Sequence, residues 1–125
     1  MPDISEPQPD VLDTSVIRRL RSLGEATGHD LMSQLVPLFL ADDDERAEEL
    51  RQALRCRDVD ALARTAHPRG GSGANLGATE LARLCARLSA PSAAADPTCS
   101  ETLFDRIEAE LPRVRSALRK LVAPA

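Results

Sequence analysis

The sequence predicts an all-α protein: an antiparallel up-down four-helix bundle with a short extra helix at its N-terminus. Composition favours helix over strand, because the 125 residues include nineteen Ala and eighteen Leu but only two aromatic and few β-branched side chains. Apolar residues also recur at steps of three and four along most of the chain. Amphipathic helices joined by short loops pack most simply as such a bundle.

Length and charge restrict the function. A chain of 13.5 kDa fits one domain and has no room for an ATP-binding lobe, so autonomous kinase activity is not expected. The net charge is -4 and the fifteen Arg are scattered among acidic residues, so a nucleic-acid partner is not expected. No apolar run is long enough to span a bilayer and the N-terminus lacks a signal-peptide pattern, so we expect a cytoplasmic protein without membrane insertion.

The chain is expected to begin with a disordered lead-in over residues 1–10, which hold three prolines and three acidic residues, followed by a helical bundle domain over 11–123. A short first helix carries apolar residues at Leu12, Val16, Leu20 and Leu23. Gly24 and Gly28 then break its pattern. Three residues are candidates to cap its start: Asp13, Thr14 and Ser15.

A helical period continues from about Asp30 to Leu54. Pro37 lies inside it and costs about 3 kcal/mol unless the helix kinks or restarts, so the pattern predicts either one kinked helix or two in succession. A run of acidic residues in this segment has no histidine nearby and no calcium-loop spacing, so it is interpreted as a solvated face: Asp42, Asp43, Asp44, Glu45, Glu48 and Glu49.

Three further helices are predicted. One is capped by Asp58 and ends near Gly77, and the next begins around Thr79. Residues 89–98 are expected to be a loop, in which Asp96 and Pro97 serve as N-cap and first turn of the final helix. That helix, despite Pro112, presents a core stripe of Leu103, Ile107, Leu111, Val114, Leu118 and Leu121.

The three cysteines argue against a disulfide framework and against a zinc site, because their number is odd and no CxxC spacing occurs. Cys85 falls on an apolar stripe, so we expect a buried thiol there. No metal site is expected in this chain.

One histidine has an unusually bare helical neighbourhood. The residues beside His67 on a helix surface are Ala63, Gly70, Gly71 and Ala74, none of which has a long side chain. Glycine in a helix interior costs about 0.5–1 kcal/mol relative to alanine, so two adjacent glycines indicate close approach of another molecule. An accessible imidazole, with an ordinary pKa near 6.5, is a nucleophile toward phosphoryl groups at neutral pH.

These residues resemble the histidine-containing phosphotransfer (HPt) domain family. The resemblance covers roughly residues 12 to 122. It rests on Leu62, Ala66 and His67, on Gly71 and Ser72, on the Asn-Leu-Gly-Ala run at 75–78, and on Leu81, Leu84, Cys85 and Leu88. The family implies a four-helix bundle whose histidine takes a phosphoryl group from the aspartyl phosphate of a response-regulator receiver domain and passes it to another receiver. A hybrid histidine kinase is a further implied partner.

The resemblance also implies roles for individual residues. His67 would be the phosphoacceptor, Gly71 would admit the receiver's loops, and Ser72 would assist near the imidazole. This chain needs no cofactor of its own, and Mg²⁺ is expected on the receiver. With Ala63, Gly70 and Ala74, these residues form the expected docking and support set.

The chain departs from the family pattern in three adjacent residues. Gly70 stands where members usually have a lysine, so Arg64, one turn before His67, is expected to supply part of the charge. Arg69 occupies the slot of an inward-facing leucine. Pro68 is expected to kink or locally open the helix at His67.

Two other functions remain open at this stage. The first is a degenerate module that binds receivers or other partners without carrying phosphate. The second is a metal or hydrolytic enzyme, which would require His67 and His29 to converge with carboxylates.

Overall fold

The computed structural model describes residues 11–122, and these form six helices and no strand, which confirms the all-α class. The helices are α1 (Thr14–Thr27), α2 (Leu31–Arg55), α3 (Val59–Asn75), α4 (Thr79–Ser89), α5 (Pro91–Ala95) and α6 (Pro97–Val122). Residues 1–10, expected to be a disordered lead-in, lie outside the described residues, as does residue 123 of the expected domain.

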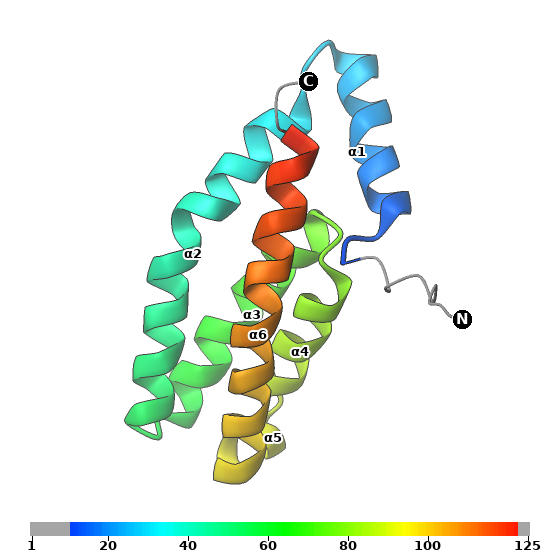
Figure 1. Ribbon diagram of the computed structural model, residues 1–125. Helices are drawn as coiled ribbons and strands as arrows, with labels where there is room; N and C mark the ends of the chain where they lie inside the picture. Colours follow the sequence, from blue (N-terminus) through cyan, green and yellow to red (C-terminus); the bar gives the residue numbers. More distant parts are fainter. Residues whose placement is uncertain (1–10, 123–125) are drawn as a thin grey trace, which may run out of the picture.

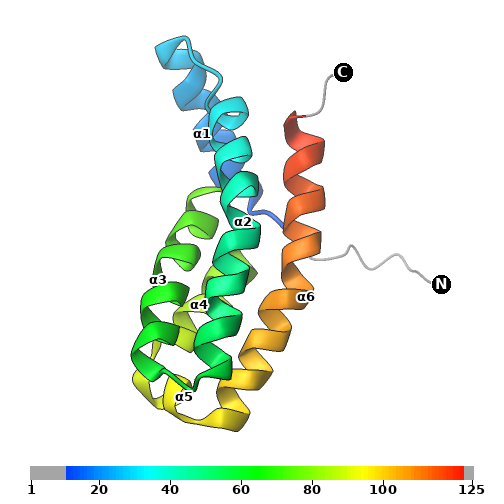
Figure 2. The same cartoon turned by 90° about the vertical axis from the view of Figure 1, so that its left-hand side faces the viewer.

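Four of the helices make the bundle. In Figure 1, α2 runs downward, α3 returns upward, α4 runs down again and α6 returns beside α2 and α4. Their inward faces form one apolar core, with fully buried side chains such as Val36, Leu50, Leu62, Leu84 and Ile107. The predicted up-down arrangement is therefore present. Figure 2 shows that α1 lies beside the upper part of α2, as the extra helix of the prediction.

Helix α1 is longer than the glycine pattern predicts. The Asp13 carboxylate caps it by accepting from the Ser15 backbone N–H at 2.9 Å. The helix then passes through Gly24 and ends at Gly28, whose φ is +77°. The predicted break at Gly24 is wrong. The glycine is needed because the chain folds back against α1 after the helix ends, and a Cβ at residue 24 would lie 2.3 Å from the carbonyl oxygen of His29.

Helix α2 is one continuous helix, capped by Asp30, so the alternative of two successive helices is wrong. Pro37 lies on its exposed side, where the ring meets solvent instead of the core. Figure 1 shows the first part of α2 leaning relative to the rest. A proline removes one helical hydrogen bond and bends a helix without ending it when tertiary packing holds both halves.

The sequence predicts a loop over residues 89–98, but part of this segment is helical. Pro91 starts the short helix α5, whose Ala94 is buried in the core. Proline is favoured at a first helical position because its missing N–H has no intrahelical partner there. The predicted start of the final helix is confirmed, since the Asp96 carboxylate accepts from the backbone N–H groups of Thr98 and Cys99.

Hydropathy adds one further observation: within residues 11–122, no helix is long and apolar enough to cross a membrane.

Candidate functional site

Helix α3 carries the candidate site and is fixed at both ends. The Asp58 carboxylate caps its start by accepting from the Ala61 N–H at 3.0 Å, as predicted. The helix ends at Asn75, and Gly77 follows with a φ of +81°. The Gly77 carbonyl oxygen accepts from the Asp13 N–H at 2.7 Å, which ties the end of α3 to the start of α1.

His67 stands exposed on the outer face of α3. Arg64, Gly71 and Ala74 are exposed on the same face, and Ala63 is half-buried at its edge. A Cβ at Gly71 would meet no atom within 4 Å, so the space above this glycine is open. The structure therefore brings four of the predicted docking residues together around an accessible imidazole.

The helical spacing predicts Gly70 on the exposed face beside His67, but the structure places it on another side of α3. It is buried against α4, where an added Cβ would lie 3.1 Å from Cys85 Cβ and 3.4 Å from the Ala82 carbonyl oxygen. The reason is geometric: a residue three positions on is rotated by about 60° from His67, and this flank of α3 faces α4. Gly70 thus supports the site from behind the exposed face.

Ser72 also points away from the imidazole. It lines a cavity of about 160 Å³ between α2 and α3, together with Asn75, Arg46, Phe39 and Leu38. In the described part of the chain, no hydrogen bond joins Ser72 to His67. Of these cavity residues, Leu38 is 64% exposed and stands at the α2 edge of the site.

Pro68 does not open the helix. Helix α3 continues through it, and the proline ring lies on the exposed surface. Because proline has no N–H, the Arg64 carbonyl oxygen loses its usual partner four residues on. The predicted local opening at His67 is therefore absent, and the helix must be held by other contacts.

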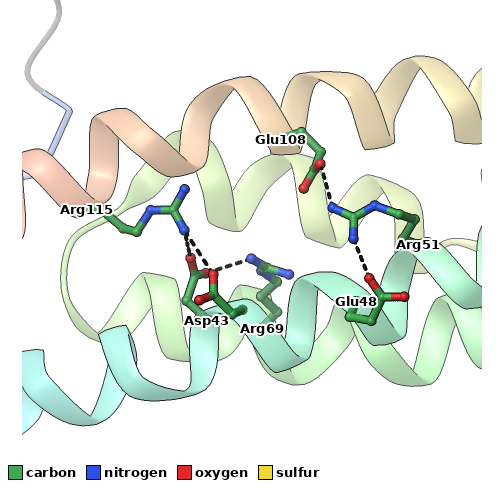
Figure 3. A network of polar contacts seen from close by, with 7 residues as sticks. Asp43, Glu48, Arg51, Arg69, Glu108 and Arg115 are labelled. Carbon is green, nitrogen blue, oxygen red and sulfur yellow. Dashed lines mark hydrogen bonds and ion pairs between the residues drawn. The ribbon is translucent and has the colours of Figure 1, made fainter.

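One of these contacts is an ion-pair network below the site, two members of which are buried (Figure 3). Arg69 Nη2 of α3 donates to Asp43 Oδ1 of α2 at 2.7 Å, and Arg115 Nη1 of α6 donates to Asp43 Oδ2 at 2.5 Å. Arg69 and Asp43 are 1% and 2% exposed. We call Asp43, Arg69 and Arg115 the buried triad.

The interpretation of the acidic run as a solvated face is wrong for Asp43 alone, which points into the core, while the other five residues are exposed. The spacing along α2 indicates that Asp43 is buried, because it falls on the stripe of Val36, Ala47 and Leu50. Arg69 likewise continues the stripe of Leu62, Ala66 and Gly73. A charged residue on each of two facing stripes is the pattern that predicts a buried pair.

The thiol of Cys85 is buried, as predicted, in the interface of α3 and α4. Burial raises its pKa to about 11, although the positive charge of Arg69 opposes this shift. The site thus has a protonated, unreactive thiol beneath it at neutral pH.

A metal or hydrolytic centre would need several ligating side chains together. In the stretch from 11 to 122, no group of three or more His, Cys, Asp or Glu residues is placed to hold a metal ion. His29 lies between α1 and α2, on the turn that precedes the Asp30 cap, whereas His67 is in the middle of α3.

Fold and site together define a class of protein: a helical bundle that presents one accessible histidine on a bare helix face. A family model, the Hpt domain, matches residues 34–117, more than half of the chain. The crystal structure of histidine-containing phosphotransfer protein B (HptB) from Pseudomonas aeruginosa PAO1 is similar, with 30% sequence identity and a TM-score of 0.74 over 93% of this chain and 95% of that one. No curated protein matches the chain.

The chain therefore belongs to the Hpt domain family, and it is a histidine phosphotransfer protein of two-component phosphorelays. Membership implies receiver domains and kinases as partners in general terms.

Proposed function

We propose that His67 is the phosphoacceptor, which takes a phosphoryl group from the aspartyl phosphate of a receiver domain and passes it to a second receiver. The observation that carries this proposal is the exposed imidazole on a face formed by Gly71, Ala74 and Ala63. Since these neighbours are small, a partner's active site can approach the ring closely.

The chemistry requires little from this chain. A ring nitrogen of the neutral imidazole attacks phosphorus, an N–P bond forms, and the P–O bond to the aspartate breaks, so the receiver regains its carboxylate. The imidazole then loses its ring proton to solvent and becomes neutral phosphohistidine. In this proposal the receiver contributes the aspartate and the Mg²⁺, and no cofactor belongs to this chain.

Charge near the phosphoryl group would come from Arg64. Its exposed side chain lies one turn before His67 on the same side of α3, and no ion pair within residues 11–122 engages it. A free guanidinium stabilises phosphoryl oxygens through charge-assisted hydrogen bonds. Arg64 would thus take the part of the lysine that Gly70 replaces.

The docking surface would extend to α2. Leu38 is exposed beside the cavity that Ser72 and Asn75 line, so an apolar side chain of α2 stands near these two residues of α3. Such a surface suits a small, transient contact with a receiver.

The proposed compartment is the cytoplasm, which agrees with three cysteines that form no disulfide.

A second candidate is a module that docks receivers without carrying phosphate. Gly70 favours it, because a glycine buried against α4 leaves the site without the family's lysine. The two candidates differ in a single observable, which is phosphate on His67.

Label transfer distinguishes them. Radiolabelled phosphoryl groups on a panel of receiver domains are offered to the wild type, to His67→Gln and to His29→Gln, the exposed second histidine that serves as the matched control. Acid-labile label on the wild type and on His29→Gln, but not on His67→Gln, supports the relay. Receiver binding without label on the wild type supports the docking module instead.

A further inference from the structure

The part of α3 around His67 has little tendency to be helical by itself. Pro68, Gly70, Gly71 and Gly73 fall within six residues, and proline and glycine are the two residue types with the lowest helix propensity. Pro68 also removes the hydrogen bond that would close the turn onto the Arg64 carbonyl. Nonetheless α3 is continuous from Val59 to Asn75, so contacts with other helices must hold this turn.

On one side, α4 supplies those contacts. Gly70 and Gly73 lie against Cys85, Ala78 and Leu81 at distances that leave room for little more than a hydrogen atom at Gly70. This close approach fixes the flank of α3 that faces α4, but it is only van der Waals packing and does not join α3 to α2 or α6.

The buried triad holds the neighbouring flank, which faces α2. Arg69 is the residue after Pro68 and the largest fully buried side chain in the described part of the chain. Figure 3 shows its guanidinium directed at Asp43, with Arg115 approaching the same carboxylate from α6. A single carboxylate therefore joins α3 to both α2 and α6 at the level of the histidine turn.

We propose that Asp43 and Arg69 are positioning residues for His67: the ion pair keeps the turn weakened by Pro68 in helical geometry and so holds the imidazole for phosphoryl transfer. This inference rests on the proposed function of His67. Transfer through a loose transition state depends mainly on placement of the reacting atoms, so a loosened turn lowers the transfer rate even when the protein stays folded.

Asp43→Asn is the decisive variant, because Asp43 lies on α2, outside the histidine turn, and is joined to that turn by the hydrogen bond from Arg69. It keeps the side-chain shape and one acceptor oxygen but removes the negative charge. Arg115→Gln is a milder second variant, since Arg115 is partly exposed and its loss leaves the Asp43–Arg69 contact in place.

The control is Glu108→Gln. Glu108 of α6 accepts from Arg51 Nη2 of α2 at 3.0 Å, so this pair also joins α2 to α6 but does not touch α3 (Figure 3). A second background, Pro68→Ala, restores the missing N–H and removes the largest single propensity cost in the turn.

Two measurements are made on each folded variant. The first is the rate of phosphoryl transfer from a labelled receiver, at saturating and at limiting receiver concentration. The second is hydrogen exchange of the backbone amides between 66 and 71, which excludes Pro68 because it has no N–H. Asp43→Asn is expected to lower the saturating rate about tenfold with a KM within about twofold of wild type, and to speed exchange at 66 to 71. Arg115→Gln is expected to shift both in the same direction by less, and Glu108→Gln neither.

In the Pro68→Ala background the loss caused by Asp43→Asn is expected to shrink to within about twofold. The inference is overturned if folded Asp43→Asn protein transfers at the wild-type rate, or if the loss is the same in both backgrounds. If the wild type accepts no label from any receiver, the proposed function fails. The exchange data then still decide the structural part: unchanged exchange at 66 to 71 in Asp43→Asn overturns the claim that the pair holds this turn.

Discussion

Gly70 of α3 and Cys85 of α4 approach so closely that a Cβ on residue 70 would lie 3.1 Å from the Cβ of Cys85. Both atoms would be attached directly to a backbone, so no side-chain rotation can relieve the contact. The Ala82 carbonyl oxygen, at 3.4 Å from the same point, closes the space further. A glycine here brings the site helix and its neighbour into direct backbone contact.

Gly70→Ala is therefore expected to destabilise the fold. Moving α4 away costs about 1–3 kcal/mol, which exceeds the gain of up to about 1 kcal/mol in helix propensity. Gly71→Ala is the matched control, because open space surrounds Gly71 and only the propensity gain remains. Urea denaturation of the two variants tests this, and a Gly70→Ala protein as stable as the wild type would contradict it.

The buried triad predicts unequal effects for its two central residues. Asp43→Ala leaves Arg69 as a buried cation without a partner, and breaking such a pair costs about 3–5 kcal/mol. Arg69→Leu is expected to cost far less, because Asp43 keeps its contact with Arg115 and leucine refills the space. In addition, Arg69 Nε and Nη1 have no hydrogen-bond partner among residues 11–122, so their removal breaks no further protein hydrogen bond.

Denaturation of the two single variants and of the double variant measures this asymmetry. The double variant is expected to be more stable than Asp43→Ala alone, since no unpaired charge remains. Equal losses in the two single variants would show that the charge of Arg69 is compensated in another way.

The helices could be predicted from the sequence because their signals are local. Asp58 and Asp96 each cap the helix that the sequence assigned to them, and Asp13 is the cap among three candidates. The failures arise where the cause is distant in space. Gly24 lies inside a helix because the backbone of His29 packs directly against it. Residues 91–95 form a helix whose Ala94 is buried in the core.

The site also contains residues that local spacing predicts and residues whose position depends on neighbouring helices. His67 and its bare neighbours follow from spacing along α3, whereas the burial of Gly70 and the direction of Ser72 depend on where α4 and α2 lie. The acidic residues around Asp43 hide its place on the apolar stripe of α2, because the whole run has the composition of an exposed face. Periodicity identifies the residues that point inward, but not the partner that makes an inward charge tolerable.

The cysteines are expected to react in order of exposure. Cys56 is exposed, Cys99 is partly buried, and Cys85 is buried with a pKa raised to about 11 by its surroundings. A thiol-specific reagent at pH 8 should modify Cys56 first and Cys85 only after denaturant is added. Peptide mapping of the modified protein tests this order.

The raised pKa of Cys85 also gives a direction to the pH dependence of stability. The unfolded thiol ionises near its ordinary value of 9.0, whereas the folded thiol stays protonated until about pH 11. The unfolded state thus loses its proton first, so the contribution to stability is present below pH 9 and is lost as the pH rises toward 11. Cys85→Ala should flatten this part of the stability curve, and a curve unchanged by that substitution would contradict the assignment.

Leu38 is expected to be a receiver contact. It is 64% exposed on α2, beside the cavity that Ser72 and Asn75 of α3 line. Leu38→Ser removes apolar surface from the proposed docking face and should weaken receiver binding about tenfold, which corresponds to about 1.4 kcal/mol. Because the side chain is exposed, the stability of the free protein should change by less than about 0.5 kcal/mol.

Leu23 provides the matched control for Leu38. It is 53% exposed, but it lies on α1, away from the face of His67. Leu23→Ser therefore removes a similar apolar surface without touching the proposed docking face. Titration of one receiver domain against wild type and both variants measures the difference. Equal weakening by the two substitutions, or unchanged binding by Leu38→Ser, would place the receiver contact on another face of the bundle.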